Sequence, residues 1–524
     1  MVKMSVRVRF APSPTGTLHV GAFRDALFKF LYARHTSGTN ILRIEDTDRT
    51  RYNPESEQEF IDTLAWGGII FDEGPHIGGP FAPYRQSERK EEGIYAKWID
   101  HLLGLGGAYY AFDTPEELVE MREFQRINHQ PTGYFGGEWR DASQADVDAA
   151  KAQGKPYVIR QKVRRDRTIS IQDVIRGEIQ WDSNTIDDPV LIKADGMPTY
   201  HFASMVDDHL MDITHIMRGE EWISSAPKHA ELFDLFGWER PIFVHCPVIV
   251  GNDGKKLSKR HGATRVLDYA SEGYLPHSLK NFVALIGWSP GDDREAMSEQ
   301  ELVDTFDITH IQASPGRFQL EKLKWLNGIE IRNMSVDELS AILIQYINDP
   351  LTAAYWLSFV GEVGTADEKI DGKRTWQTLK LLGEHLESEP DYAISAIRLE
   401  QERVLRLSEF GEACSFFFED PVTMDLYASK KWLAQAYVHD LFNKILEKLP
   451  NQRNLTESDC EDAIKEIASE LGFEKLGPVV HPTRVALTGR TFGPGLWELM
   501  TVLGYKRIER RLHYASQVGA DMTI

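Results

Sequence analysis

The chain has little cysteine, no long apolar run and fewer basic than acidic residues. Its three cysteines, Cys246, Cys414 and Cys460, are widely separated among 524 residues, which excludes a disulfide framework and indicates a reducing compartment. No apolar run approaches the ~20 residues of a membrane span, and a strand expected from residue 6 leaves no room for a signal or transit peptide. We therefore expect a cytoplasmic protein with no membrane partner.

The shortage of basic residues also bears on nucleic-acid binding. There are 59 Lys and Arg against 80 Asp and Glu, a net charge of −21, and nonspecific binding to nucleic acid favours basic domains. Any nucleic acid would have to bind local basic faces, and the candidates are residues 160–167 and 506–511. For each cluster taken alone, a solvated face that binds nothing is the commoner role.

What is present is typical of a multidomain globular protein. The length predicts three or four domains. A strand at 5–10, a helix at 19–36 with apolar residues at helical spacing, and a strand at 40–45 predict a βαβ unit with parallel strands. Further strands are expected at 190–192, 213–217 and 243–244. The hundred residues between these two sets contain Gly-rich turns and predict an insertion.

Beyond residue 330 the pattern is helical. Ser335 with Glu338 and Thr456 with Asp459 form the spacing of capping boxes, which mark helix N-termini. The apolar residues at 433–449 recur with a period near 3.6. This period predicts helical rather than β-barrel C-terminal domains.

Two short segments carry the chemistry. The first, SPTGTLHVG at 13–21, places His19 and Gly21 at the N-terminus of the expected helix, where free amides and the helix dipole favour an anion. The second, KKLSKR at 255–260, places cations behind an Asn-Asp-Gly turn. Either segment alone is weak evidence of a catalytic site, because such loops and charge clusters are common. Together they suggest a clamp on a triphosphate.

In this order, the two segments resemble the paired signatures of class I aminoacyl-tRNA synthetases, usually called HIGH and KMSKS. Here they read HVGA at 19–22 and KLSKR at 256–260. Flanking segments narrow the resemblance to glutamyl-tRNA synthetases of bacterial and organellar type, namely RFAPSPTG at 9–16, RIEDTDR at 43–49 and PTYHFA at 198–203. The resemblance is specific from residue 5 to about 330 and looser beyond.

The resemblance implies an α/β N-terminal half, a Rossmann-type parallel sheet with an inserted α+β acceptor-binding domain, followed by all-α C-terminal domains. Its implied boundaries are 1–80 and 189–245 for the two halves of the catalytic domain, 81–188 for the inserted tRNA acceptor-binding domain, 246–332 for a stem-contact region carrying the KLSKR loop, 333–405 for a helical domain and 406–524 for a helical anticodon-binding domain. A monomer is the family expectation.

The implied activity is ligation of L-glutamate to tRNA(Glu). Glutamate and ATP, with Mg²⁺, give glutamyl-adenylate and pyrophosphate, and the glutamyl group then passes to the 3′-terminal adenosine of tRNA. The resemblance also implies that activation needs bound tRNA. Because a carboxylate is already a competent nucleophile, catalysis is positioning and charge neutralisation.

Glutamate carries one ammonium and two carboxylates. By resemblance, Glu45 pairs with the ammonium, while Arg9 and Arg218 offer planar forks to carboxylate. A structural Arg–Glu bridge is the alternative for residues at strand ends. Glutamine would leave a buried guanidinium without its anion, at a cost of roughly 2–4 kcal/mol. The full set of expected glutamate-binding residues is Arg9, Ala11, Ser13, Glu45, Tyr200 and Arg218.

ATP would lie across the two signatures. The helix N-terminus faces the phosphates, and Gly21 permits close approach of the adenosine. By resemblance, the catalytic residues are His19, Lys256 and Lys259. The ATP-binding residues are His19, Gly21, Glu221, Trp222, Lys256, Ser258 and Lys259.

The chain departs from some relatives in its insertion. Those relatives bind zinc there through Cys-x-Cys and Cys-x-His, whereas residues 109–114 contain no cysteine and the first cysteine of the chain is Cys246. We therefore predict no structural zinc. Cys246 is expected to be a buried core thiol.

Three alternatives remain at this point. The enzyme could be non-discriminating and also charge tRNA(Gln). It could be a small-molecule adenylyl or nucleotidyl transferase, although such an enzyme has no use for the long helical tail. It could be a degenerate synthetase that only docks tRNA, although both signatures are intact. Shorter paralogues that glutamylate a modified tRNA base lack the tail at 335–524.

Overall fold

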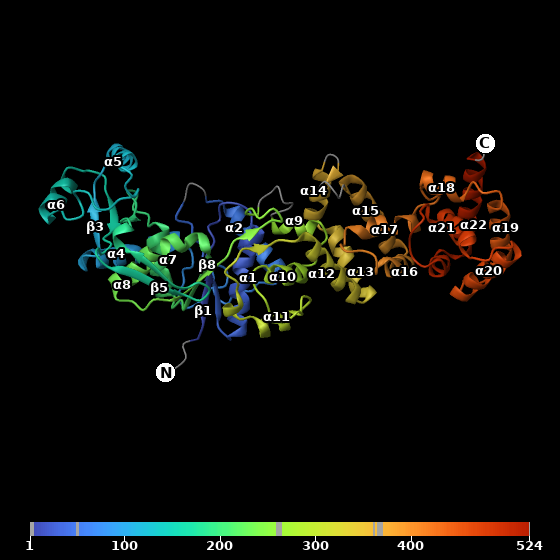
Figure 1. Ribbon diagram of the computed structural model, residues 1–524, viewed down its shortest axis with the longest axis horizontal. Coiled ribbons are helices and arrows are strands. Elements are labelled where there is room, and N and C mark those ends of the chain that lie inside the picture. The colour runs from blue at the N-terminus through green and yellow to red at the C-terminus, as the bar shows by residue number, and fades with distance from the viewer. Residues whose placement is uncertain (1–4, 49–51, 258–264, 360–361, 364–369, 523–524) are drawn as a thin grey trace. The chain divides into compact units, whose positions relative to one another are not determined.

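The computed structural model describes residues 5–48, 52–257, 265–359, 362–363 and 370–522 (Figure 1). The chain forms two compact units. Unit 1 contains Met1–Val266 and Leu279–Gln319, and unit 2 contains Leu267–Ser278 and Leu320–Ile524.

The centre of unit 1 is a set of parallel strands. β1 (Arg7–Phe10) pairs in parallel with β2 (Thr39–Leu42), and β8 (His215–Gly219) pairs in parallel with β9 (Ile242–Cys246). β1 lies beside β8, where the Thr214 amide donates to the Arg7 carbonyl at 3.0 Å. The expected parallel βαβ unit is therefore confirmed, and the carboxyl ends of these strands share one edge.

The helix that crosses between β1 and β2 is α1 (Val20–His35), and it follows the apolar spacing of the sequence. Val20, Phe23 and Leu27 are fully buried on the face that packs on the sheet. After the helix ends, Gly38 lets the chain pass close to β1, because a Cβ at this position would lie 2.4 Å from the Val6 carbonyl oxygen.

The expected insertion contains two β-structures that the sequence did not separate. A three-stranded antiparallel sheet is formed by β3 (Ala108–Ala111), β4 (Val158–Gln161) and β7 (Val190–Ile192). The strand expected at 190–192 is thus present, but it joins this antiparallel sheet and not the parallel one. The hairpin of β5 (Thr168–Asp173) and β6 (Gly177–Asp182) instead extends the parallel set through a β5–β9 pairing.

The remaining elements of unit 1 surround these sheets. The helices are α2 (Pro54–Trp66), α3 (Gln86–Glu91), α4 (Ile94–Gly104), α5 (Pro115–Ile127), α6 (Gln144–Ala152), α7 (Tyr200–Leu210), α8 (Ala226–Phe236) and α11 (Glu299–Thr305). Two short strands, β10 (Ile249–Val250) and β11 (Gly316–Arg317), pair in parallel. The helices α9 (Val266–Ser271) and α10 (Pro276–Ala284) contain the points at which the chain passes between the units.

Unit 2 is built from helices, with one short antiparallel pair, β12 (Glu362–Val363) and β13 (Ile370–Asp371). Both capping boxes predicted from the sequence are present, since Ser335 and Thr456 each accept a hydrogen bond from the backbone three residues later. The helices are α12 (Leu320–Asn333), α13 (Val336–Asn348), α14 (Pro350–Ser358), α15 (Gly372–Ser388), α16 (Pro390–Glu400), α17 (Glu409–Phe418), α18 (Leu426–Trp432), α19 (Val438–Lys448), α20 (Glu457–Glu470), α21 (Gly477–Thr488) and α22 (Leu496–Asp521).

The two basic clusters are largely committed to internal contacts. In the first, Arg164 pairs with Glu231 at 2.7 Å and Arg165 with Asp188 at 2.8 Å. In the second, Arg511 donates to the Leu487 and Glu419 carbonyl oxygens, while Arg507 and Arg510 pair with Glu389 and Asp420. These clusters support the fold more than they offer a free basic face.

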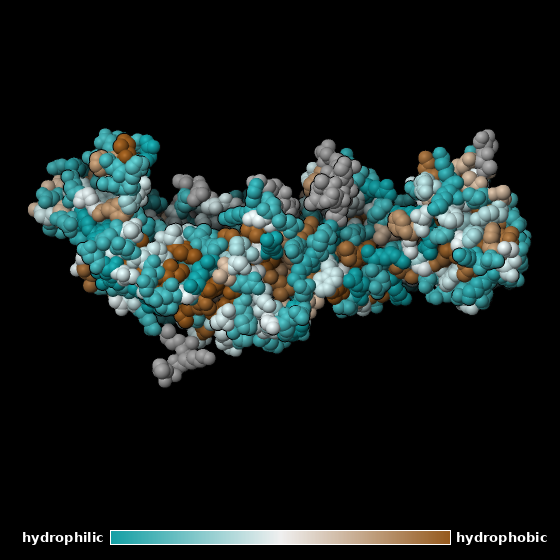
Figure 2. Space-filling model, viewed as in Figure 1, coloured by the Kyte–Doolittle hydropathy of each residue, from teal (hydrophilic) through white to brown (hydrophobic). Residues whose placement is uncertain are grey.

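The visible face of the molecule is mostly hydrophilic, with scattered apolar patches such as the one on α5 (Figure 2). In the described part of the chain, no helix is both long enough and apolar enough to cross a membrane.

Candidate active site

A cavity of about 860 Å³ opens at the carboxyl edge of the parallel strands. It brings together every candidate residue that the structure describes, from segments up to 247 positions apart; Ser258 and Lys259 lie outside the described residues. The candidates that line it are Arg9, Ala11, Ser13, His19, Gly21, Glu45, Tyr200, Arg218, Glu221, Trp222 and Lys256.

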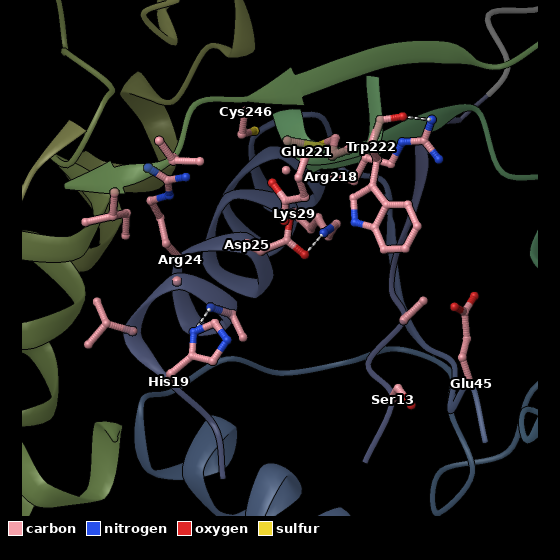
Figure 3. A pocket seen from close by; sticks show the side chains of 18 of the residues that line it. Ser13, His19, Arg24, Asp25, Lys29, Glu45, Arg218, Glu221, Trp222 and Cys246 are labelled. Carbon is pink, nitrogen blue, oxygen red and sulfur yellow. Dashed lines mark hydrogen bonds and ion pairs between the residues drawn. The ribbon is translucent and has the colours of Figure 1, made fainter. Parts of the chain in front are cut away.

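The strands and helices explain this convergence. Arg9 lies in β1, with Ala11 and Ser13 in the loop after it, and Glu45 follows β2. Tyr200 is the first residue of α7, Arg218 lies in β8, and Glu221 and Trp222 lie in the short 3₁₀ helix Glu220–Ser225 that follows. Figure 3 shows Ser13, Glu45, Arg218 and Trp222 on one side of the cavity and His19 on the other.

His19 is the N-cap of α1. Its Nδ1 accepts a hydrogen bond from the Ala22 amide at 3.2 Å, so the proton of the neutral ring is on Nε2. Desolvation within the cavity, followed by the positive charge of Lys256, lowers the pKa of His19. The ring therefore offers a neutral N–H donor beside the unpaired amides of the helix N-terminus, a combination that suits a phosphate.

Gly21 keeps that ring in place. A Cβ at Gly21 would lie 3.2 Å from both Cε1 and Nδ1 of His19, closer than side chains normally pack. A larger residue would therefore require the imidazole to shift by a few tenths of an ångström. The glycine of this motif thus protects the orientation of the histidine as well as space for a ligand.

Arg9 belongs to a buried charge network. Its Nε and Nη2 donate to the two carboxylate oxygens of Asp208 at 2.9 and 3.1 Å. Arg43 donates to the same Asp208 at 2.7 Å and to Glu45 at 3.0 Å. Burial alone would raise the pKa of Asp208, but Arg43 and Arg9 outweigh this and hold it below its usual range. Because these cations share two carboxylates, the network is close to neutral.

Glu45 is the carboxylate of the network that lines the cavity. It is 7% exposed, and its Oε1 accepts the bond from Arg43. Burial raises the pKa of Glu45, while Arg43 and Arg9 oppose the rise. A ligand ammonium beside this carboxylate would favour its charged form.

Arg218 has a different environment. Its guanidinium donates to His245 Nε2 at 3.1 Å, to His229 Nδ1 at 2.9 Å, to the Tyr200 hydroxyl at 3.3 Å and to the Trp222 carbonyl at 3.5 Å. The residue is only 5% exposed. Among the residues that the structure describes, none of its contacts is an anion, so its positive charge is directed into the cavity without a counterion.

The histidines of unit 1 predict how its stability depends on pH. Burial, followed by Lys228, lowers the pKa of His201 to about 4, and burial lowers that of His215 to about 4, against about 6.5 in an unfolded chain. Between pH 6.5 and 4 the unfolded chain therefore binds more protons than the folded one. We expect the thermal midpoint to fall as the pH is lowered through this window.

Scanning calorimetry at pH 7, 6 and 5 tests this expectation, with His215→Gln as the control variant. Because this variant removes one titrating group, its midpoint should depend less steeply on pH than that of the wild type. A wild-type midpoint that does not change between pH 7 and 5 would contradict the expectation.

Asp208 holds Arg9, and His229 and His245 hold Arg218. None of these three partners was predicted from the sequence. One signal was available for Asp208, because Asp207 and Asp208 are adjacent carboxylates in an otherwise apolar helical segment. Such a pair is rarely buried without partners. His245 stands alone in an apolar strand, and His229 follows Lys228 on a helix, so neither gives a comparable signal.

Comparison with protein families gives two matches. Residues 5–325 match the model of the catalytic domain of class I tRNA synthetases (E and Q), and residues 377–516 match that of an anticodon binding domain. Among curated proteins, the chain is 40% identical to a glutamate–tRNA ligase of Chlorobium chlorochromatii, over 98% of each chain. It is 39% identical to a glutamate–tRNA ligase of Elusimicrobium minutum, over 98% of this chain and 99% of the relative.

Solved structures agree. A glutamate tRNA ligase from Elizabethkingia meningosepticum, in complex with its amino acid, superposes with a TM-score of 0.85 at 35% identity, over 98% of this chain and 99% of that one. The enzyme from Elizabethkingia anophelis gives a TM-score of 0.82 at 35% identity. The chain therefore belongs to the class I tRNA synthetases, and within them to the glutamate–tRNA ligases of bacterial type.

Proposed function

We propose that the protein ligates L-glutamate to tRNA(Glu), and that glutamate and ATP react in the cavity at the carboxyl edge of β1, β2 and β8. The observation that carries the proposal is the pairing of two features in one cavity. One is Arg218, a buried arginine that has no anionic partner in the described part of the chain, and the other is a helix N-terminus capped by a neutral histidine. The first suits a carboxylate and the second a polyphosphate.

Glutamate occupies the side of the cavity that holds Glu45 and Arg218. Arg218 binds the side-chain carboxylate, assisted by the Tyr200 hydroxyl, because it lies away from the helix N-terminus where the reacting phosphate must be. Glu45 pairs with the ammonium. Arg9 is held by Asp208, and its remaining N–H groups add positive potential near the α-carboxylate. Ala11 and Ser13 complete the wall.

ATP occupies the other side. Its phosphates lie against the first turn of α1, where the His19 Nε2–H and the free amides donate to them. Lys256, which is exposed at the cavity rim, binds the triphosphate. Ser258 and Lys259 stay predicted ATP-binding residues that lie outside the described ranges. The adenosine extends across the cavity from Gly21 toward Glu221 and Trp222, of which Trp222 lies on the side of Arg218 (Figure 3).

The first step needs positioning more than proton transfer. One oxygen of the glutamate α-carboxylate attacks the α-phosphorus of ATP, the bond to the β-phosphate oxygen breaks, and pyrophosphate leaves. The carboxylate is ionised at neutral pH, so no general base is required. The rate enhancement comes from the effective concentration of the bound reactants, from hydrogen bonds of His19 and the helix amides to the phosphates, and from the positive charge of Lys256. In the second step a ribose hydroxyl of the terminal adenosine attacks the glutamyl carbonyl and AMP leaves.

Mg²⁺ would accompany ATP. Within the described ranges no three His, Cys, Asp or Glu side chains gather as metal ligands. The ion would therefore take most of its ligands from phosphate and water, which is its usual preference. Its chemistry is to neutralise phosphate charge. The absence of structural zinc stays a prediction from the lack of cysteine in the insertion.

Unit 2 offers a site for an unpaired tRNA base. A cavity of about 630 Å³ is lined by Phe492 together with four arginines and four carboxylates, among which Arg403 pairs with Glu400 and Arg406 with Glu409. The Phe492 side chain is 71% exposed, which suits stacking on a base. We propose that this cavity takes part in binding the anticodon.

A Phe492→Ala variant should raise the KM for tRNA by about tenfold or more, because stacking contributes about 1–3 kcal/mol per base. The KM for glutamate at saturating tRNA should not change. Tyr427→Ala is the matched control, since Tyr427 is 73% exposed in the same unit and does not line the cavity. Equal effects of the two variants on the KM for tRNA would argue against this assignment.

Glutamate-dependent exchange between ATP and pyrophosphate, with and without total tRNA, tests the proposed activity. We expect exchange with glutamate and not with glutamine or aspartate, and only when tRNA is added. If a small molecule other than glutamate supported ATP–pyrophosphate exchange without tRNA, the result would favour a nucleotidyl transferase. No exchange by folded protein would leave a tRNA-docking module. Charging of tRNA(Gln) would identify a non-discriminating enzyme.

A further inference from the structure

Two chains of hydrogen bonds end on Arg218, and the proposed chemistry does not use them. In the first, Arg218 Nε donates to His245 Nε2 at 3.1 Å, and His245 Nδ1 lies 2.7 Å from the Asp173 carboxylate. In the second, Arg218 Nη1 donates to His229 Nδ1 at 2.9 Å, and His229 Nε2 lies 2.9 Å from His201 Nδ1. His245 and His229 are fully buried, and Asp173 is 4% exposed.

The geometry fixes the protons of both histidines. A guanidinium can only donate, so His245 Nε2 and His229 Nδ1 must both be unprotonated acceptors. The proton of His245 is then on Nδ1, where it is donated to Asp173. The proton of His229 is on Nε2, where it is donated to His201. A second proton on either ring would set an N–H group against an N–H group of Arg218.

Because its histidine partners are neutral, Arg218 keeps a positive charge that a carboxylate partner would cancel. Arg9 is bound directly by Asp208, which cancels most of its charge. Arg218 is oriented through imidazole nitrogens, which hold its plane but leave its charge for a ligand. Asp173 contacts His245 and not Arg218, so it fixes the tautomer of His245 rather than neutralising the arginine.

We propose that His245, His229 and Asp173 are positioning residues, which orient Arg218 for the side-chain carboxylate of glutamate and thereby sustain the preference for glutamate over glutamine. This inference rests on the proposed function. The low pKa values of the histidines agree with it, because burial lowers the pKa of His229 well below its usual value and also lowers that of His245.

The two histidines present opposite ring nitrogens to Arg218, which allows a crossed set of variants. Asparagine places its terminal atoms near the Nδ1 position of histidine, and glutamine places them near Nε2. His245→Gln and His229→Asn therefore keep an acceptor for Arg218. His245→Asn and His229→Gln remove it. All four variants replace a ring by an amide in the same core. A loss of packing alone would therefore not raise the KM for glutamate of His245→Asn and His229→Gln above that of His245→Gln and His229→Asn.

The measurement is tRNA-supported ATP–pyrophosphate exchange with glutamate and glutamine, together with thermal midpoints. We expect His245→Asn and His229→Gln to raise the KM for glutamate by about tenfold, the equivalent of one lost hydrogen bond to a charged group. Their ratio of kcat/KM for glutamate over glutamine should fall. The other two variants should raise the KM for glutamate by no more than about threefold. The KM for ATP should differ much less among the four variants than the KM for glutamate does.

Equal KM values for glutamate across the four variants, or an order that follows the thermal midpoints, would overturn the positioning role. Wild-type protein without glutamate-dependent exchange would instead overturn the proposed function. The two failures are therefore distinguishable.

Discussion

Replacing Arg218 with alanine is expected to lower kcat/KM for glutamate by roughly a thousandfold. Removing one partner of a buried, hydrogen-bonded charge pair costs about 4 kcal/mol, and each 1.4 kcal/mol is a factor of ten. The other cations that line the described cavity have other partners or roles. Arg9 is bound by Asp208 and Lys29 by Asp25, whereas Arg24 donates to backbone carbonyl oxygens and Lys256 is proposed to bind ATP. ATP–pyrophosphate exchange with glutamate in the presence of tRNA measures the effect.

Two comparisons separate binding of the carboxylate from a general loss of structure. Arg218→Lys keeps the charge but not the planar fork, and it should retain more activity than the alanine variant. In both variants the KM for ATP should stay within a few fold of wild type, since the phosphates of ATP are proposed to bind at the other side of the cavity, against the N-terminus of α1. A loss of affinity shared equally by glutamate and ATP would show that Arg218 supports the cavity rather than the substrate.

The sequence predicted the parts of the fold that depend on local pattern. The apolar spacing from Val20 to Leu31 marks α1, and Ser335 and Thr456 mark the starts of two helices in unit 2, because caps and helical periodicity are properties of neighbouring residues. The candidate residues also converge as expected, since residues that follow parallel strands share one edge of the sheet. Their individual roles stay proposals.

The sequence could not predict which strands and which charged residues pair when they lie far apart in the chain. The strand at 190–192 has the apolar composition of a parallel strand, yet it pairs antiparallel with β4. The arginines of 160–167 read as a basic surface, but Arg164 and Arg165 are neutralised by Glu231 and Asp188 from distant segments. The composition gives the number of charged residues, whereas the fold determines which of them form ion pairs.

Asp208 is the most consequential of these hidden partners. An Asp208→Asn variant should lose about 3–5 kcal/mol of stability, because it leaves Arg9 and Arg43 buried with too little negative charge. The asparagine amide would also place a donor where Asp208 now accepts from Arg9. Scanning calorimetry should record a fall of roughly 10 °C in the midpoint of unit 1. The KM for glutamate should rise as well, since Arg9 would no longer be held in the cavity wall.

Asp207→Asn is the matched control for that last effect. Asp207 is equally buried on the same helix, but it accepts its hydrogen bonds from Gln86, Arg89 and Tyr95. It approaches Arg43 only at 3.9 Å and forms no ion pair with Arg9 in the described residues. Both variants remove a buried carboxylate, so both should destabilise unit 1, and only Asp208→Asn should change the KM for glutamate. If the two variants raised this KM equally, the effect would reflect lost stability. If Asp208→Asn alone raised it, the carboxylate that neutralises Arg9 would also be the group that positions it, so one buried contact would serve both fold and site.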